Sequence, residues 1–160
     1  MSSIYGADGY KKMLVGYETM VNDSLRRNAI VAPSETDGVL PGDLLLTSSA
    51  RQVYTRAKAA LTGTQKIAGI ALATNVKLDP MFPQSPTDIV FKPGDRVACV
   101  IHGSIAVPLT GTAPVEGADV YYDYTNRAFT TTTTGTIAFP GARFTGKTEG
   151  NVTEVYVQYI

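Results

Sequence analysis

The chain has 160 residues, of which 44% are apolar and 18% are charged, and its 14 basic residues balance 14 acidic ones. A chain of this length is expected to form one domain around an ordinary core, and its balanced charge argues against the basic surface that nucleic-acid binding requires. No run approaches the roughly 18 apolar residues of a membrane span, and the first residues lack the pattern of a secretory signal, so we expect synthesis and retention in the cytosol.

The first 38 residues differ from the rest of the chain in the spacing of their apolar residues. Apolar residues recur near helical spacing in "GYKKMLVGYETMVNDSLRR", but Gly16 interrupts the pattern and Asn22-Asp23-Ser24 is typical of a turn. We therefore expect residues 1–38 to form an extended or partly helical N-terminal arm. Tails seldom carry so many large apolar side chains without a partner, so we predict an arm ordered against neighbouring proteins, with a disordered terminus as the alternative.

From Val39 onward, Gly- and Pro-containing turn signals separate short runs rich in β-forming residues. This pattern is typical of an all-β barrel or sandwich. We therefore predict a single β domain over residues 39–160. The expected strands are 44–48, 51–57, 66–73, 95–101, 104–109, 119–124, 128–134 and 154–160.

Three aspartates, Asp43, Asp95 and Asp119, stand in Pro-Gly-Asp or Gly-Ala-Asp turns just before expected strands. We interpret them as turn-forming residues, because aspartate in such a turn accepts hydrogen bonds from nearby backbone amides. Two further turns are expected. Gly103 would reverse the chain in a tight hairpin, and Pro140-Gly141-Ala142 would form another turn.

Three segments of the predicted domain have features of possible contact surfaces. The strand 154–160 carries apolar residues on both faces, so it lies centrally in a sheet or meets another subunit. The threonine run 130–134 favours an extended backbone at a surface, with a loose loop as the alternative. Residues 77–93 carry four prolines and are expected to protrude as a loop.

Little in the sequence indicates catalysis. Cys99 is the only cysteine and is expected to be buried and inert, which leaves no internal disulfide. His102 is the only histidine, so a two-histidine metal site is excluded, and a structural role is expected for it. No phosphate-binding loop or nucleophile elbow is present. We therefore predict a protein without catalytic residues, metal or cofactor.

The ordered series "LPGDLLL", "KIAGIALA", "PGDRVACVIHGSIAV", "APVEGADVYYD" and "FPGARFTGKTEGNVTEVYVQ" resembles the bacteriophage head decoration proteins, also called structural cement proteins. The resemblance covers about Val39 to Ile160 and rests on the order and spacing of turn–strand units. It implies a compact β-barrel or β-tulip-like domain, frequently trimeric, that binds the outer surface of an assembled head between capsomers. It implies no catalytic residues.

A cement function would place the protein on the outer capsid surface of the virion, with the major capsid protein as its partner and a homotrimer as its expected form. We expect the contact residues to be large side chains that the domain's own core does not need. The candidates for contact with the capsid or a neighbouring subunit are Tyr5, Tyr10, Met13, Tyr17 and Met20 of the arm, and Met81 and Phe82 of the proline-rich loop.

Two other functions compete with this interpretation. Tyr121, Tyr122 and Tyr124 would suit a virion-borne host- or carbohydrate-binding module if they formed a stacking platform, whereas alternate packing into core and surface is the structural alternative. The stretch "DVYYDYTNR" faintly resembles the aspartate–tyrosine motif of trimeric dUTPases. The phosphate motif and the glycine-rich tail of those enzymes are missing, which disfavours the second possibility.

Overall fold

A computed structural model describes residues 13–19, 24–73 and 89–158, and all helix or strand structure in these ranges is β-strand. The predicted all-β fold is therefore confirmed. The strands are β1 (Leu25–Val31), β2 (Leu44–Thr47), β3 (Val53–Arg56), β4 (Ile67–Ala71), β5 (Arg96–Pro108), β6 (Asp119–Asp123), β7 (Ala128–Thr130), β8 (Ile137–Glu149) and β9 (Val152–Val157).

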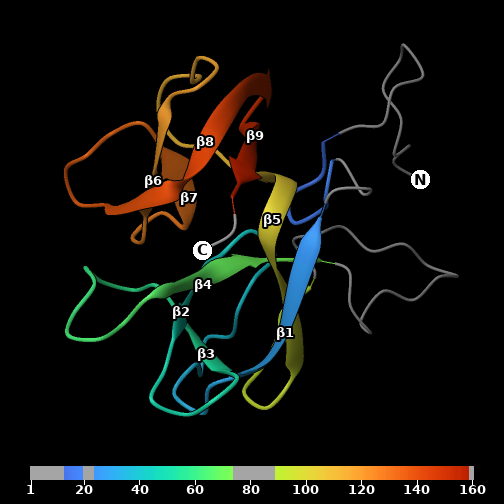
Figure 1. The fold of residues 1–160 in the computed structure, drawn as a ribbon, viewed down its shortest axis with the longest axis vertical. Coiled ribbons are helices and arrows are strands. Elements are labelled where there is room, and N and C mark those ends of the chain that lie inside the picture. The colour runs from blue at the N-terminus through green and yellow to red at the C-terminus, as the bar shows by residue number, and fades with distance from the viewer. Residues whose placement is uncertain (1–12, 20–23, 74–88, 159–160) are drawn as a thin grey trace, which may run out of the picture.

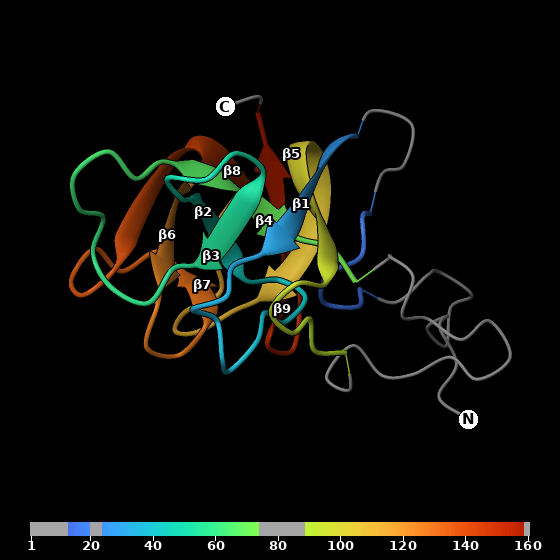
Figure 2. The ribbon, with the colours of Figure 1, turned by 90° about the horizontal axis from the view of Figure 1, so that it is seen from below.

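The first five strands close into a barrel. They pair in the order β1-β3-β2-β4-β5, and β1 pairs again with β5, which completes the ring. The β1–β3 pair is parallel and the other pairs are antiparallel. Seen from below, β1–β5 surround a common interior (Figure 2). Closure leaves fewer unpaired strand edges than an open sheet of the same length would have.

Strand β5 continues out of the barrel and organises the second half of the molecule. Its residues 96–102 pair with β1, and its residues 103–108 pair with β9. The order then runs β5-β9-β8-β6-β7, and a bridge between Leu109 and Phe129 brings β7 back to the end of β5. In Figure 1, β6–β9 lie above β1–β4, and β5 runs along both groups.

The predicted hairpin at Gly103 is wrong, because β5 is one continuous strand across this residue. Gly103 has a positive φ of 128°, and a Cβ atom here would lie 2.9 Å from the Cβ of Ser24. The glycine therefore permits a change of direction and a close neighbour inside the strand. It marks the point where β5 changes partner from β1 to β9.

The predicted turn at Pro140-Gly141-Ala142 is also wrong, because these residues lie inside β8, a strand that the sequence analysis missed. Residues 137–139 of β8 pair with β6, and residues 142–149 pair with β9. The register of the β6–β8 pair shifts between Asp119 and Val120. A proline is tolerated at such an irregularity because no ladder hydrogen bond is required from its nitrogen.

Part of the segment expected to be an arm belongs to the sheet. Residues 25–31 form β1, and Ala29 and Val31 of this strand are buried. The threonine run follows the loop alternative beyond its first residue, whereas the expected central position of the last strand is confirmed. Strand β7 ends at Thr130, so that Thr131 to Thr134 lie outside it and are exposed, and β9 lies centrally between β5 and β8.

Two clusters of buried apolar residues fill the part of the molecule that the structure describes. The first lies inside the barrel and contains Val31, Leu45, Ala71 and Cys99, which come from four different strands. The second contains alternate residues of the same strands, such as Leu44 and Ile70, together with the aromatic residues of the second half. Because neighbouring strand residues face opposite sides, the second cluster packs the outer face of the barrel against the sheet β5–β9.

Candidate functional site

The structure describes two of the seven predicted contact residues. Tyr5, Tyr10, Met20, Met81 and Phe82 lie outside the described residues. Met13 is 6% exposed. Tyr17 is partly buried against the apolar cluster of the barrel, and this burial raises its pKa. Both side chains therefore pack on their own chain.

Residues 13–19 are attached to β5 by backbone hydrogen bonds. The amide of Gly16 donates to the carbonyl of Ala106 at 2.8 Å, and the amide of Ala106 donates to the carbonyl of Tyr17 at 3.0 Å. The amide of Thr19 donates to the carbonyl of Ser104 at 3.0 Å. The segment thus lies beside β5 as a short antiparallel addition.

An ion pair fastens the same segment to β1. The side chain of Glu18 is 3% exposed, and its Oε1 accepts a hydrogen bond from Arg26 Nε at 2.9 Å. A second bond joins Arg26 Nη2 to Glu18 Oε2. This bidentate pairing satisfies a buried carboxylate that would otherwise be costly to bury. Hydrogen bonding to Glu18 raises the pKa of Arg26.

The described residues that border segments 1–12 and 74–88 lie close together. The amide of Ala73 donates to the carbonyl of Gly16 at 2.8 Å. The loop 38–42 contacts both sides of this junction, because Val39 pairs with Phe91 and a Cβ on Gly16 would lie 2.4 Å from Pro41. Segments 1–12 and 74–88 therefore leave the described structure from one region of the molecule.

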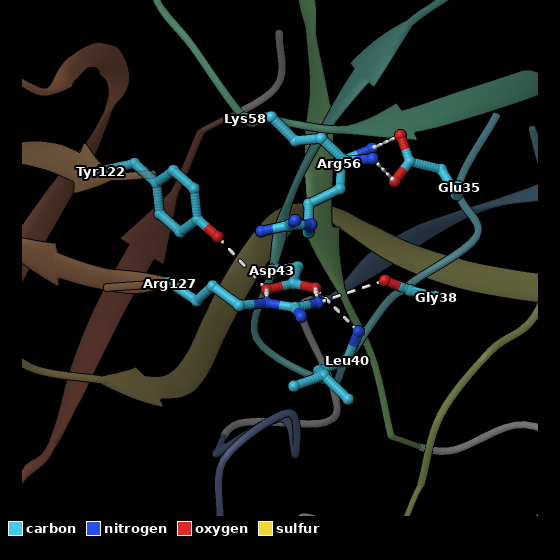
Figure 3. Close-up of polar contacts among 8 residues, drawn as sticks. All are labelled: Glu35, Gly38, Leu40, Asp43, Arg56, Lys58, Tyr122 and Arg127. Carbon is cyan, nitrogen blue, oxygen red and sulfur yellow. Dashed lines mark hydrogen bonds and ion pairs between the residues drawn. The ribbon is translucent and has the colours of Figure 1, made fainter. Parts of the chain in front are cut away.

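A buried ionic network joins the barrel to the second half (Figure 3). Asp43 stands just before β2 and its side chain is 2% exposed. Its Oδ1 accepts hydrogen bonds from Arg127 Nε at 3.0 Å and from the hydroxyl of Tyr122 at 3.2 Å. Its Oδ2 accepts from the amide of Leu40 at 2.7 Å and pairs with Arg127 Nη2. The carboxylate therefore forms its predicted turn and also bonds residues of the other half.

The network shifts the pKa values of Tyr122 and Arg127. Burial raises the pKa of Tyr122, and the negative charge of Asp43 raises it further. Burial, the largest single effect, would lower the pKa of Arg127, but hydrogen bonding to Asp43 and the nearby negative charge of Asp43 together outweigh it and hold this pKa above its ordinary value. Both groups therefore stay protonated, and the site has the character of a structural clamp.

A second buried carboxylate, Glu35, lies near this network. Its Oε2 is 2.8 Å from Lys58 Nζ, and its Oε1 accepts from the amide of Arg56 at 3.2 Å. Sequence reasoning missed both Glu35 and Arg127. Asp43 and Arg127 are 84 positions apart, so no local pattern joins them.

The other two aspartates of the predicted turns are Asp95 and Asp119. Asp95 has the predicted turn-forming hydrogen bond, and Asp119 lies at the surface. Asp95 Oδ2 accepts from the amide of Lys92 at 2.8 Å, as expected for a turn-forming aspartate. Asp119 is exposed and lies 3.3 Å from Arg143 Nη1. Among the residues that the structure describes, no group of three or more His, Cys, Asp or Glu side chains is placed to hold a metal ion.

The tyrosines of β6 do not form one platform. Tyr122 is fully buried between the halves, whereas Tyr121 and Tyr124 are partly exposed. Tyr122 packs against Phe129 with ring centroids 5.0 Å apart. This is the alternate packing into core and surface that the sequence analysis gave as the structural alternative, and it removes the central member of a stacking surface.

His102 and Cys99 have structural positions. The Nε2 atom of His102 is 3.3 Å from the hydroxyl of Tyr156, and the two rings pack edge to face. Cys99 is buried in the barrel and lies 3.7 Å from the carbonyl oxygen of Ala68. Burial raises the pKa of Cys99 to about 11, which keeps it an unreactive thiol.

An open groove of about 430 Å³ lies where the N-terminal segment, the end of β5 and the turns β6–β7 and β8–β9 meet. Its lining is mainly apolar and includes Val15, Pro41, Pro108, Leu109 and Val152. Within the described ranges, the structure contains no helix long and apolar enough to cross a membrane.

Comparison with known proteins agrees with the resemblance seen in the sequence. Residues 7–158 match the family described as "Structural cement protein (E217 gp24/Pam3 gp6)". No curated protein matches the chain. A chain of the solved structure "The capsid of Myoviridae Phage XM1" has a similar fold, with a TM-score of 0.68 and 16% sequence identity over 98% of this chain and 97% of that chain.

The structural similarity supports the fold, and the family match supports the function. The match spans most of the chain, including the region from residue 7 to residue 38 that the sequence resemblance did not cover. Because this family consists of structural proteins, it disfavours the enzyme and sugar-binding alternatives. The chain belongs to the family of phage structural cement proteins, and its role is the decoration of a phage capsid on the virion.

Proposed function

We propose that the protein binds the outer surface of the assembled head between capsomers and stabilises the shell against rupture. The observation that carries this proposal is the match of residues 7–158 to the structural cement family. The physical mechanism is linkage. A protein that binds the assembled lattice and not the dissociated subunits adds its binding free energy to the stability of the lattice.

The partner in this proposal is the major capsid protein. The balanced charge of 14 basic and 14 acidic residues suits a partner that is protein and not nucleic acid. The proposed contacts are Tyr5, Tyr10 and Met20 near the N-terminus and Met81 and Phe82 in the loop. Met13 and Tyr17, which pack on their own chain, hold the first of these segments in position.

The convergence of chain ends supports one contact region. Ala73, which directly precedes segment 74–88, is hydrogen-bonded to Gly16, which follows the last residue of segment 1–12 by four positions. Large aromatic and methionine side chains that gather in one region make effective anchors, because a few such residues carry most of the energy of a protein interface.

We further propose that three copies act together as a homotrimer. Closed symmetry is the default for homo-oligomers, and a trimer that touches several capsid subunits gains avidity of ~10²–10⁴ over a single site. Light scattering distinguishes a 17.0 kDa monomer from a trimer of about 51 kDa.

The experiment that tests the proposed function is co-sedimentation. Purified protein is mixed with emptied heads that lack it, with dissociated capsid protein, and with host cells. Binding to heads alone supports a cement function. Binding to host cells and not to heads would instead favour the receptor-binding alternative and contradict the proposal.

A truncated chain lacking residues 1–12 tests the proposed N-terminal contacts in the same assay. All described strands begin after this segment, so the domain is expected to fold without it. Weaker attachment of the truncated chain to heads supports the proposed N-terminal contacts, whereas equal attachment removes Tyr5 and Tyr10 from the interface.

A further inference from the structure

The groove between the β-turns has the chemistry of a site for an amphipathic side chain. Pro41, Pro108, Leu109 and Val152 give it apolar walls. Two exposed amides, Asn126 and Asn151, also line it and supply polar groups at its margin. An occupant with an apolar body and one hydrogen-bonding tip satisfies both parts of this lining, and tyrosine is the side chain of that kind.

The N-terminal segment starts at the edge of this groove. The amide of Met13, the first described residue, donates to Glu149 Oε2 at 3.2 Å. Glu149 is two positions before Asn151, and Val15 lines the groove itself. The chain is therefore held beside the groove at the point where twelve further residues begin.

One of those twelve residues is within easy reach. Tyr10 is three positions before Met13, and three residues of extended chain span about 10 Å. Tyr5 is eight positions away and is separated from the groove by a longer stretch of chain. The groove volume of about 430 Å³ is ample for one aromatic side chain.

We propose that Tyr10 of the same chain docks in this groove and anchors residues 1–12 to the barrel. The occupant is expected to come from the same chain, because Tyr10 is covalently attached only three positions before Met13. A side chain held a few residues from its site has an effective concentration on the order of millimolar, which exceeds that of a free partner in dilute solution. The ring packs between Pro108 and Leu109, and its hydroxyl bonds to Asn126 or Asn151.

The docked tyrosine has a consequence for capsid attachment, and this part depends on the proposed function. A segment that is already ordered loses less conformational freedom when it binds, so its affinity is higher than that of a free tail. Under this proposal Tyr10, given above as a capsid contact, instead fixes the segment to its own barrel, and Tyr5 remains the aromatic residue of segment 1–12 that contacts the capsid.

The test uses the full chain and needs no capsid, so its failure is distinguishable from failure of the proposed function. The protein contains no tryptophan, and Tyr10→Trp therefore introduces a single indole with the same combination of apolar body and polar tip. The expected result is a blue-shifted emission with low quenching by acrylamide, independent of protein concentration.

A matched pair of lysine substitutions locates the docking site. Leu109→Lys places a charge in the groove and is expected to lower the docking equilibrium constant by about tenfold or more. It should shift the emission toward that of a solvent-exposed indole. Leu61→Lys makes the same change at a residue that is 41% exposed and does not line the groove, and it should leave the emission unchanged.

Several outcomes would overturn the proposal. The first is an indole that is exposed in the unaltered background, and the second is a buried indole that Leu109→Lys does not affect. A blue shift that appears only at high protein concentration assigns the groove to a neighbouring copy. If Leu109→Lys loses the far-ultraviolet signal of the fold, Thr110→Lys at the same groove replaces it. A Tyr5→Trp chain that responds equally to Leu109→Lys would show that Tyr10 is not the anchor.

Discussion

The barrel of β1–β5 and the sheet of β5–β9 share one strand, but they are filled by side chains of different size. Most interior positions on the barrel strands hold small or β-branched residues such as Ala29, Val97 and Cys99, and this cluster contains two buried aromatic residues, Tyr54 and Phe91. The space between the halves holds Tyr122, Phe129, Phe139 and Phe144. A five-stranded ring leaves little room inside, whereas a sheet that leans over the barrel's outer face leaves a space that aromatic rings fill.

This difference indicates where the domain is held together. The barrel closes through backbone pairing of β1 with β5. The second half is joined to it by β5, by the aromatic cluster and by the buried Asp43–Arg127–Tyr122 network. We therefore expect the largest losses of stability from changes at the junction and smaller ones from changes inside the barrel.

The largest effect is expected at the aromatic cluster. Phe144 is 1% exposed, and Phe144→Ala should lower the free energy of unfolding by about 3–5 kcal/mol because it leaves a cavity. Val97→Ala inside the barrel should cost about 1–2 kcal/mol, since fewer buried groups are removed. Urea unfolding measures both. Equal losses would contradict the expectation that an aromatic residue of the junction contributes more to stability than a small residue inside the barrel.

The next effect concerns the buried ion pair. Arg127→Met leaves Asp43 without its charged partner and should cost about 3 kcal/mol. Adding Asp43→Asn to this variant should recover part of the loss, because the uncompensated charge is then gone. Arg143→Met is the matched control. Its partner Asp119 has a side chain that is 66% exposed, so a loss below about 1 kcal/mol is expected. A similar loss for both arginines would refute the role of the clamp.

The dependence of stability on alkaline pH tests the burial of Cys99 inside the barrel. The pKa of Cys99 rises from 9.0 to about 11 on folding. Folding therefore favours the protonated thiol, so its contribution is complete below about pH 9 and is lost as the pH rises toward 11. Two pKa units correspond to about 2–3 kcal/mol. Burial of Tyr122 acts in the same direction. Unfolding measured from pH 8 to 11 should show this decline, and Cys99→Ala should reduce its slope. An unchanged slope would remove Cys99 from the explanation.

The smallest effect is local to the N-terminal segment. Glu18→Gln weakens the pair with Arg26 and should destabilise residues 13–19 by about 1 kcal/mol. Amide hydrogen exchange at Gly16 and Thr19, which both bond to β5, should then quicken about fivefold. The amide of Ala71 in the barrel serves as the control and should be unaffected. Equal acceleration at all three amides would mean that the segment and the barrel open together.

The strands that follow Pro-Gly-Asp or Gly-Ala-Asp turns were predictable because the turn residues act locally. Asp95, for example, bonds the amide of Lys92 three positions away. The paths of β5 through Gly103 and of β8 through Pro140 were not predictable in this way. The same residues that form turns also permit a bend or bulge within a strand, and the outcome depends on partner strands that are distant in the sequence.

The candidate site likewise has a part that could be predicted from the local sequence and a part that could not. Large side chains near the N-terminus indicated a contact segment, and Met13 and Tyr17 belong to a stretch that β5 holds. The groove was beyond sequence reasoning, because its lining comes from positions as far apart as Val15 and Val152. The clamp on Asp43 likewise needs Arg127, 84 positions away. Only the folded chain brings such residues together.

The most direct test of the cement function is the temperature at which phage heads rupture. Heads assembled without this protein should remain intact at low temperature but release their contents at a lower temperature than decorated heads. Adding the purified protein back should restore the higher value. The same rupture temperature with and without the protein would contradict the central claim.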